Sequence, residues 1–238
     1  MQTPYYIQPH DTGFPDATLA LRDPDGLLAV GGDLAPQRLI EAYRNGIFPW
    51  YATGQPVLWW SPDPRAVLFP EHFRIARSLR KLLRQHRYSV TYDTCFTAVM
   101  EACAAPRNAD TDTWITVDMI DAYSELHRLG HAHSTEVWHR GELVGGLYGV
   151  ALGRVFFAES MFSRHANTSK VALAHLTARL HQQGYRLIDC QMHTPHLASL
   201  GAEKLPRHEF IRLLQQWRDM PPLATPWDNP GYRPHEHA

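Results

Sequence analysis

The segments AHSTEVW (132–138), LVGGLYGVA (143–151) and VFFAESMF (155–162) decide the fold of this chain. Each contains β-branched or aromatic residues, and short glycine-containing turns separate them, which predicts three consecutive antiparallel strands. A helical segment, residues 168–183, and a short buried strand, LIDCQ (187–191), come next. An antiparallel meander followed by a long helix and one more strand predicts an α+β fold with a mixed central sheet.

The remaining segments divide the chain into two unequal domains. Residues 1–62 are rich in turn residues and contain one short predicted helix, 36–45, so we expect a small N-terminal domain there. Residues 63–238 form the second domain, and its tail is rich in Pro and His from residue 221 onward. Outside the meander, we expect strands at 66–69 and 88–92 and helices at 74–86, 94–104, 117–129 and 209–217.

The composition is that of an ordinary globular protein and excludes several other classes. Of 238 residues, 44% are hydrophobic and 20% are charged, which is unlike a disordered chain. The longest uncharged apolar stretch, 143–153, is much shorter than the about 20 residues that span a bilayer, and the first residues show no secretory signal. Cys95, Cys103 and Cys190 do not make a disulfide framework, so we expect a protein of the reducing cytoplasm, without membrane segments.

Positive charge is concentrated in one segment of a chain whose net charge is −1. No acidic residue occurs between positions 72 and 92, while Arg77, Arg80, Lys81 and Arg84 recur at the spacing of one helix face. A solvated surface helix is the ordinary alternative, but like charges one turn apart repel, and nothing acidic offsets them. Arginine suits phosphate, so we expect a polyanion on this helix, with an RNA or DNA backbone preferred over a lipid surface.

Two histidines, His131 and His133, alternate on a predicted strand and would share one face. A zinc site would need further ligands at a recognisable spacing, and the sequence has none there, so we expect structural roles and no bound metal. The sequence also lacks a phosphate loop, a dinucleotide fingerprint and a serine nucleophile elbow. We therefore expect no cofactor.

Polar residues end the predicted strand 187–191. Asp189 and Gln191 are two positions apart, so a regular strand would point both side chains to one face. Such a pair must be hydrogen-bonded within the fold or used chemically, and both interpretations stay open. Glu159 stands among large apolar residues and would be desolvated unless paired. Its neighbour Met161 would either pack in the core or line an apolar pocket.

Three tryptophans, Trp50, Trp59 and Trp60, lie within eleven residues of each other, beside prolines. They would form either a small hydrophobic core under irregular loops or a platform on which a ring or base stacks. The spacing alone does not separate these two interpretations.

Ten short motifs, in order between about residues 14 and 210, make the chain resemble the bacterial leucyl/phenylalanyl-tRNA–protein transferases. This resemblance implies transfer of Leu or Phe, and less well Met, from aminoacyl-tRNA to the N-terminal Arg or Lys of a protein. The product would then be degraded in the cytoplasm by the N-end rule. The family fold is a small N-terminal domain followed by a domain similar to the N-acetyltransferase superfamily, here residues 63–238. The motifs are GLLAVGGD (26–33), GIFPW (46–50), LWWSPDPR (58–65), TWI (113–115), GHAHS (130–134), GGLYG (145–149), ESMFS (159–163), SK (169–170), IDCQ (188–191) and SLGA (199–202).

The resemblance also implies roles for individual residues. Gln191 would orient the acceptor amine, and Asp189 would fix Gln191 or receive a proton through water. Glu159 would be the counter-charge for the acceptor's N-terminal Arg or Lys. Trp50 and Trp114 would pack around the terminal adenosine of the tRNA. The donor side chain would enter a pocket formed by Leu147, Phe156, Met161, Leu173, Leu176, Leu180 and Ile188, and Arg77, Arg80, Lys81 and Arg84 would hold acceptor-stem phosphates.

The implied partners are Leu-tRNA, Phe-tRNA and proteins with N-terminal Arg or Lys, and a monomer is the default state. No metal or cofactor is implied, because aminoacyl-tRNA is already an activated ester, and the tRNA's terminal hydroxyl is another route for the proton. A non-enzymatic RNA-binding protein and an acetyl-coenzyme A acetyltransferase are the alternatives. The turn 163–168 argues against the acetyltransferase, since it lacks the glycine-rich loop that a pyrophosphate requires.

Overall fold

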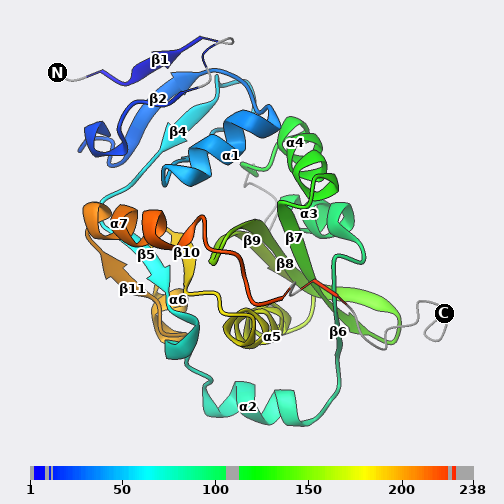
Figure 1. Ribbon diagram of the computed structural model, residues 1–238. Helices are drawn as coiled ribbons and strands as arrows, with labels where there is room; N and C mark the ends of the chain where they lie inside the picture. The colour runs from blue at the N-terminus through cyan, green and yellow to red at the C-terminus, as the bar shows by residue number, and fades with distance from the viewer. Residues whose placement is uncertain (1–2, 9–10, 12, 106–112, 225–226, 229–238) are drawn as a thin grey trace.

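The structure is a computed structural model that describes residues 3–8, 11, 13–105, 113–224 and 227–228, and it contains two β-sheets (Figure 1). The smaller sheet has four strands in the order β1-β2-β4-β3. They are β1 (Tyr5–Ile7), β2 (Leu27–Gly31), β3 (Phe48–Pro49) and β4 (Leu58–Trp60). The larger sheet has seven strands in the order β11-β5-β10-β9-β8-β7-β6. They are β5 (Arg65–Leu68), β6 (Ser89–Tyr92), β7 (Ala132–His139), β8 (Glu142–Leu152), β9 (Val155–Ser163), β10 (Leu187–Gln191) and β11 (Glu203–Leu205).

Helices occur in both parts of the chain. One short 3-10 turn, η1 (Ala17–Leu19), lies in the first part and a second, η2 (Pro70–His72), follows β5. The α-helices are α1 (Pro36–Arg44), α2 (Arg77–Arg84), α3 (Phe96–Ala104), α4 (Val117–Arg128), α5 (Thr168–Gln182), α6 (Pro195–Ser199) and α7 (Arg207–Trp217). None of the helices in the described part of the chain is both long and apolar enough to cross a membrane.

The predicted meander is confirmed. β7 pairs antiparallel with β8, and β8 pairs antiparallel with β9. β10 is added parallel to β9, and β5 lies antiparallel to β10, so the sheet is mixed. The predicted α+β class with a mixed central sheet is therefore correct. A strand and the parallel strand beside it need a long connection, and α5 provides it.

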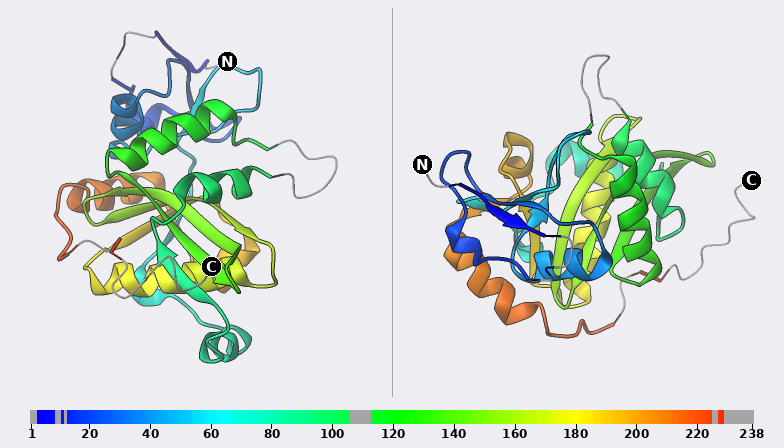
Figure 2. Two further views of the ribbon diagram at one scale, coloured as in Figure 1. Left: turned by 90° about the vertical axis from the view of Figure 1, so that its right-hand side faces the viewer. Right: turned by 90° about the horizontal axis from the view of Figure 1, so that it is seen from above.

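The two faces of the larger sheet are covered by different helices (Figure 2). α5 lies on one face, against β7, β8 and β9, while α3 and α4 lie on the other. Residues alternate accordingly: Leu147 and Phe156 are buried in the cluster that contains α5, and Tyr148 and Phe157 in the opposite cluster. Burial on both faces explains why β8 contains only glycine, apolar or aromatic residues after Glu142.

The first part of the chain packs on the face that carries α3 and α4. The ring of Tyr43 in α1 lies 4.9 Å from the ring of Phe157 in β9, and one apolar cluster runs from the small sheet into the larger one. α1 begins at a proline and ends before Gly46, which has a φ of 72°, as the sequence predicted. The four-stranded sheet was not predicted, because its strands are two to five residues long and lie between turns.

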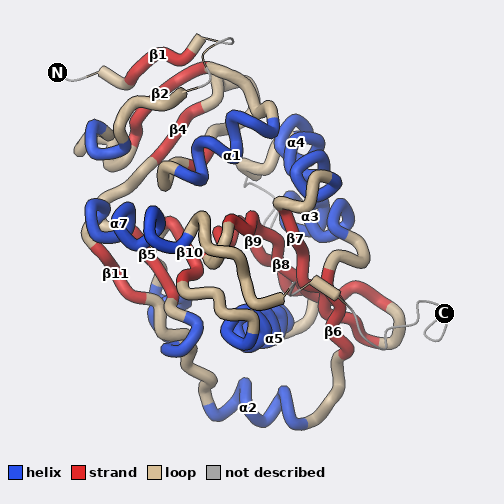
Figure 3. The backbone as a smooth tube through the Cα atoms, in the orientation of Figure 1, coloured by secondary structure: helices blue, strands red, loops and turns tan. Residues whose placement is uncertain are grey.

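α2 lies away from both sheets, on a long excursion between β5 and β6 (Figure 3). The helix is shorter than the expected span of 74–86. Arg74 donates its backbone N–H to Leu200 O, and Ala76 is extended with a ψ of 155°, so the segment before Arg77 is not helical. The remaining predicted helices and strands agree with the structure within about three residues at each end, while α6 and β11 were not predicted.

Candidate active site

The parallel pairing of β9 with β10 ends a third of the way along β9, and a cavity opens at that point. The last paired residues are Asp189 and Phe157, so β9 continues from Ala158 to Ser163 without β10 beside it. The cavity has a volume of about 870 Å³, within the range of sites that hold small ligands. Its walls come from β8, β9, β10, α3, α5 and α6, with Trp114 from the segment before α4.

One wall of this cavity is apolar. Leu147, Met161 and Leu173 line it, together with Leu197 from α6. The other four predicted pocket residues do not line the cavity but are buried behind it, in the core under α5. Phe156 and Ile188 are partners where β9 and β10 are still paired, and Leu176 and Leu180 lie further along α5, beyond Leu173.

Asp189 is fully buried, and both of its carboxylate oxygens are occupied. Arg65 donates from Nε to Oδ1 at 2.8 Å and from Nη2 to Oδ2 at 2.7 Å, and the backbone N–H of Gln191 donates to Oδ1 at 3.0 Å. The regular alternation expected for Asp189 and Gln191 does not hold. The register with β5 shifts between them, and Gln191 has a φ of 52°, a conformation that is rare outside glycine. As a result Gln191 reaches the cavity, whereas Asp189 does not.

Glu159 is the carboxyl group on the cavity wall. Gln191 donates from Nε2 to Glu159 Oε1 at 3.3 Å, and the Tyr123 hydroxyl donates to Oε2 at 3.5 Å. The hydroxyl of Tyr43 hydrogen-bonds that of Tyr123 in turn. Burial raises the pKa of Glu159 to about 8, with a further rise from Asp189, whereas the Tyr43 hydroxyl and Arg65 favour the charged form. This carboxyl group therefore loses its proton at a pH slightly above neutrality, far above the usual range of a glutamate.

The predicted cationic residues of α2 are exposed. Arg77, Arg80, Lys81 and Arg84 are all on the surface, while Leu79 is buried beneath them. Within the described residues, none of the four lies within 4.0 Å of a carboxylate oxygen, so their charges are not neutralised by ion pairs there.

A second cavity, of about 660 Å³, lies between α2 and the turn that joins β9 to α5. Lys81, Arg87, Arg164 and His165 are among its lining residues, and Asp and Glu are absent from that lining. Arg164 lines both cavities, so a cationic side chain connects this second cavity, the groove beside α2, with the main cavity, the chamber that contains Glu159 and Gln191.

The tryptophans have different environments. Trp59 is fully buried and donates from Nε1 to Gly31 O at 2.8 Å, so it belongs to the core. Trp50 is 42% exposed and packs edge-on against Trp60, with ring centroids 5.7 Å apart. Trp114 lines the main cavity and Trp50 does not. The core interpretation is thus confirmed for Trp59, while stacking of a ring or base on the exposed Trp50 stays a prediction.

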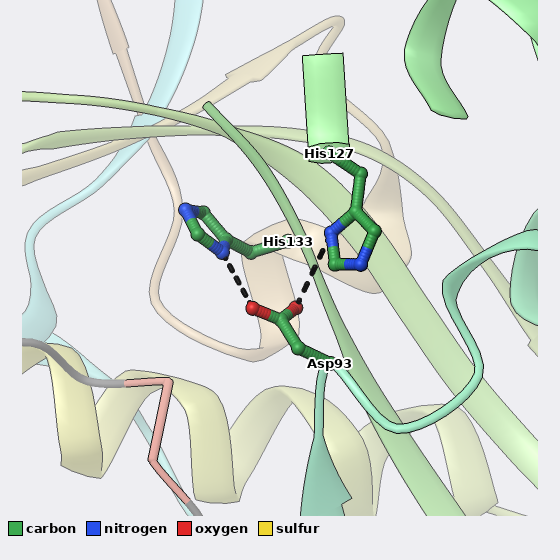
Figure 4. A group of neighbouring side chains, drawn as sticks. All are labelled: Asp93, His127 and His133. Carbon is green, nitrogen blue, oxygen red and sulfur yellow. Dashed lines mark hydrogen bonds and ion pairs between the residues drawn. The ribbon is translucent and has the colours of Figure 1, made fainter. Parts of the chain in front are cut away.

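Asp93, His127 and His133 form the one group of potential metal ligands found among the described residues (Figure 4). His133 Nδ1 lies 2.7 Å from Asp93 Oδ2, closer than two ligands of one tetrahedral zinc ion lie to each other. His127 Nδ1 is 2.8 Å from Ala132 O, so it carries a proton and donates to that carbonyl oxygen. These contacts describe a hydrogen-bonded cluster. The sequence had drawn attention to His131 instead of His127 and Asp93.

Several residues at the cavities were not singled out from the sequence. Arg65 was read only as the residue before a strand, although a lone arginine entering a buried strand signals a buried partner. Tyr43 and Tyr123 lie in two predicted helices, and no local sequence pattern connects either residue with Glu159. Arg164 lies in the turn 163–168, in which the sequence shows only the absence of a glycine-rich loop.

The sequence matches two family models. One, described as leucyl/phenylalanyl-tRNA protein transferase, matches residues 67–215, and one for the N-terminal domain of the same family matches residues 32–63. Curated proteins named leucyl/phenylalanyl-tRNA–protein transferase are similar over nearly their whole length. The protein of Saccharophagus degradans is 52% identical over 95% of this chain and 96% of its own. That of Nitrosospira multiformis is 60% identical over 87% of this chain and 89% of its own.

Solved structures show only a distant likeness. L-PGS from Bacillus licheniformis is 12% identical, covers 70% of this chain and 54% of its own, and has a TM-score of 0.41. A GCN5-related N-acetyltransferase from Kribbella flavida is 13% identical, covers 69% of this chain and 58% of its own, and has a TM-score of 0.33.

Proposed function

The chain belongs to the leucyl/phenylalanyl-tRNA protein transferase family, and as an enzyme of that family we propose that it transfers Leu or Phe, and less well Met, from aminoacyl-tRNA to the N-terminal Arg or Lys of acceptor proteins. Aminoacyl transfer from tRNA to protein is the activity that the family name describes. The choice of Leu, Phe and Met as donors and of N-terminal Arg or Lys as acceptors is part of our proposal. The proposal also includes a cytoplasmic location, a monomeric state and degradation of the product by the N-end rule.

The observation that carries this proposal is the two-sided cavity between β9 and β10. An apolar wall of Leu147, Met161 and Leu173 faces the same space as the hydrogen-bonded pair Glu159 and Gln191. A Leu or Phe side chain would be desolvated on the apolar wall, while its ester carbonyl would lie near the polar pair. One chamber would thus hold the donor residue and the acceptor amine together.

The chemistry needs positioning more than activation. The acceptor's α-amine nitrogen attacks the ester carbonyl carbon, the carbon–oxygen bond to the tRNA's terminal ribose breaks, and that oxygen leaves with a proton. Holding the two reactants in line converts a bimolecular step into one within a single complex. Neither a metal nor a nucleotide is required to activate an ester of this kind.

Gln191 is the residue we assign to the acceptor amine. Its side-chain nitrogen is held by Glu159, so its carbonyl oxygen is the group that would accept a hydrogen bond from the amine. Asp189 would act by fixing Gln191, since its oxygens already bind Arg65 and the Gln191 backbone. This arrangement favours the first of the two roles expected for Asp189 over receipt of a proton through water.

Glu159 is our candidate to recognise the cationic side chain of the acceptor. An arriving Arg or Lys would supply the positive charge that stabilises the ionised carboxylate in a buried site. The hydroxyl of Tyr123 already donates to one of its oxygens. A proton would therefore leave Glu159 when the acceptor binds at neutral pH.

The tRNA would reach the chamber from α2. Phosphates of the acceptor stem would bind the cationic residues of α2, which are Arg77, Arg80, Lys81 and Arg84. Arg164 lines both the second cavity and the main cavity, so the end of the tRNA would pass cationic side chains as it enters the main cavity. Trp114 lines the chamber and Trp50 is exposed, so both are available to pack around the terminal adenosine.

The decisive experiment mixes the purified protein with tRNA charged with labelled Phe and a peptide that begins with Arg. Label at the peptide's N-terminus supports the proposal, and the same peptide beginning with Ala or Glu is the matched control. Equal labelling of all three peptides would contradict the acceptor assignment. Transfer of acetyl from acetyl-coenzyme A in place of Phe would favour the acetyltransferase alternative.

A further inference from the structure

We propose that Arg65 is a positioning residue for the reaction, acting through Asp189 on the backbone and side chain of Gln191. This inference rests on the proposed function in one respect, the role of Gln191 at the acceptor amine. Its structural part, that Arg65 determines the shape of the end of β10, stands on the contacts of Arg65 alone.

Arg65 is the first residue of β5, and it is completely buried. Its guanidinium makes two parallel hydrogen bonds to Asp189, at 2.8 Å and 2.7 Å, and the side chains of both partners are 0% exposed. Two parallel bonds fix the carboxylate plane relative to the guanidinium plane, which a single contact does not do. The orientation of Asp189 is therefore set by Arg65.

Two aromatic rings also contact the guanidinium group of Arg65. Its central carbon lies 4.8 Å from the ring centroid of Phe48 in β3 and 4.6 Å from that of Phe210 in α7. These rings come from the N-terminal sheet and from the last helix, so three distant parts of the chain meet at this side chain. A cation between two ring faces has little freedom to turn away from its partner.

The effect reaches Gln191 through the backbone. Asp189 Oδ1, the oxygen that binds Arg65 Nε, also accepts the N–H of Gln191 at 3.0 Å. This bond spans the irregularity in the pairing with β5 and closes the turn in which Gln191 takes its φ of 52°. A non-glycine residue keeps such a conformation only when its surroundings impose it, and Asp189 supplies that constraint. The same turn directs Gln191 Nε2 to Glu159.

Stability alone does not account for this ion pair. Replacing a buried ion pair with apolar side chains is often neutral or even stabilising, because both charges lose their hydration. Lysine in place of Arg65 would keep a positive charge but could not form the two parallel bonds or lie flat between the rings. The specific geometry of arginine is therefore what the end of β10 requires.

The test compares Arg65→Lys, Arg65→Met and the double variant Arg65→Met/Asp189→Leu with the parent, using phenylalanyl-adenosine as donor and an Arg-starting peptide as acceptor. The pair Arg38–Asp33, joined at 3.0 Å in the N-terminal part, provides the matched control Arg38→Met, which removes a buried arginine away from β10. Each variant is examined for thermal melting, kcat, KM and hydrogen exchange of the Gln191 backbone N–H.

We expect faster exchange at Gln191 in all three Arg65 variants and a kcat lowered by about 10- to 100-fold, with KM for the donor within about twofold of the parent. The double variant, which leaves no unpaired buried charge, should recover melting temperature but not kcat. Arg38→Met should leave Gln191 exchange and kcat unchanged. A double variant with parental kcat and parental exchange would overturn the proposal.

The two proposals fail in different ways. A parent protein that transfers no Phe contradicts the proposed function, yet the exchange of Gln191 still decides whether Arg65 sets the strand's end. An active parent whose Arg65 variants show unaltered exchange contradicts the positioning role, whatever their kcat.

Discussion

The end of β10 and the helix α2 use arginine in opposite ways. Arg65 is 0% exposed, makes two hydrogen bonds to one carboxylate and packs between two rings, whereas the arginines of α2 are exposed and without ion pairs to described residues. The first arrangement fixes the orientation of one carboxylate group. The second presents charge over a surface and leaves its side chains free to follow a flexible partner. The two roles that we propose, positioning of Gln191 and binding of a polyanion, thus require different environments for the same residue type.

The largest difference between the two regions should be in stability. Asp189→Ala leaves Arg65 buried without its carboxylate, and we expect a loss of about 3–5 kcal/mol in the free energy of unfolding, measured by urea denaturation. Arg80→Ala in α2 should change it by less than about 0.5 kcal/mol. Equal small losses for both variants would contradict the claim that the two regions differ.

Gln191→Ala separates the rate of aminoacyl transfer from the affinity for tRNA. Because its amide is assigned to the acceptor amine and not to phosphates, the rate of transfer should fall by about 10- to 100-fold while tRNA affinity stays within about twofold. Gln191→Glu places a second carboxyl beside Glu159, so its transfer rate should depend on pH more steeply than that of the parent. Parental rates for both folded variants would show that the amide is structural.

Glu159 gives the site near β10 a pH dependence that α2 lacks. Burial raises the pKa of Glu159 to about 8, so the carboxyl group is protonated below that pH and charged above it. A cationic acceptor needs the charged form, so KM for an Arg-starting peptide should fall as pH rises from 6 to 8, by up to roughly tenfold per unit at the acid end. The affinity for tRNA should show no such change, and Glu159→Gln should leave only the dependence due to the acceptor's own α-amine, which also loses its proton near pH 8. A pH-independent KM for the peptide in the parent would rule out this role.

The smallest effect should appear on α2, where contacts are many and individually weak. Arg80→Ala together with Arg84→Ala should reduce the slope of log affinity against log salt by roughly 0.7–0.9 for each lost phosphate contact. Transfer from phenylalanyl-adenosine should be unchanged, since that donor does not reach the helix. An equal loss with the full tRNA and with the minimal donor would assign α2 to folding or catalysis.

The contrast also explains what could be predicted from the sequence. The face of α2 was visible because its residues repeat at the spacing of one helix turn within eight positions. The meander could be predicted for the same reason, since β-branched and aromatic residues and the turns between them are local signals. The buried ion pair could not be predicted, because Arg65 and Asp189 are 124 positions apart and no sequence periodicity connects them.

Local rules failed where the fold departs from regular geometry. Asp189 and Gln191 were expected on one face because strands alternate, but an irregularity in pairing intervenes and sends only Gln191 into the cavity. Phe156 and Ile188 were expected in the pocket, yet the strands separate one residue further along, so both lie in closed core. Where two strands part is set by the whole sheet and not by either segment.

The rings beside Arg65 make the chamber dependent on residues far from it in the sequence. Phe48 comes from the small N-terminal sheet, and Phe210 from the last helix, yet both touch a side chain that governs the far strand β10. Tyr43, also in the N-terminal part, does not line the main cavity. Its hydroxyl hydrogen-bonds that of Tyr123, which donates to Glu159. The alignment of the chamber therefore depends on contacts from both parts of the chain, and neither part supplies it alone.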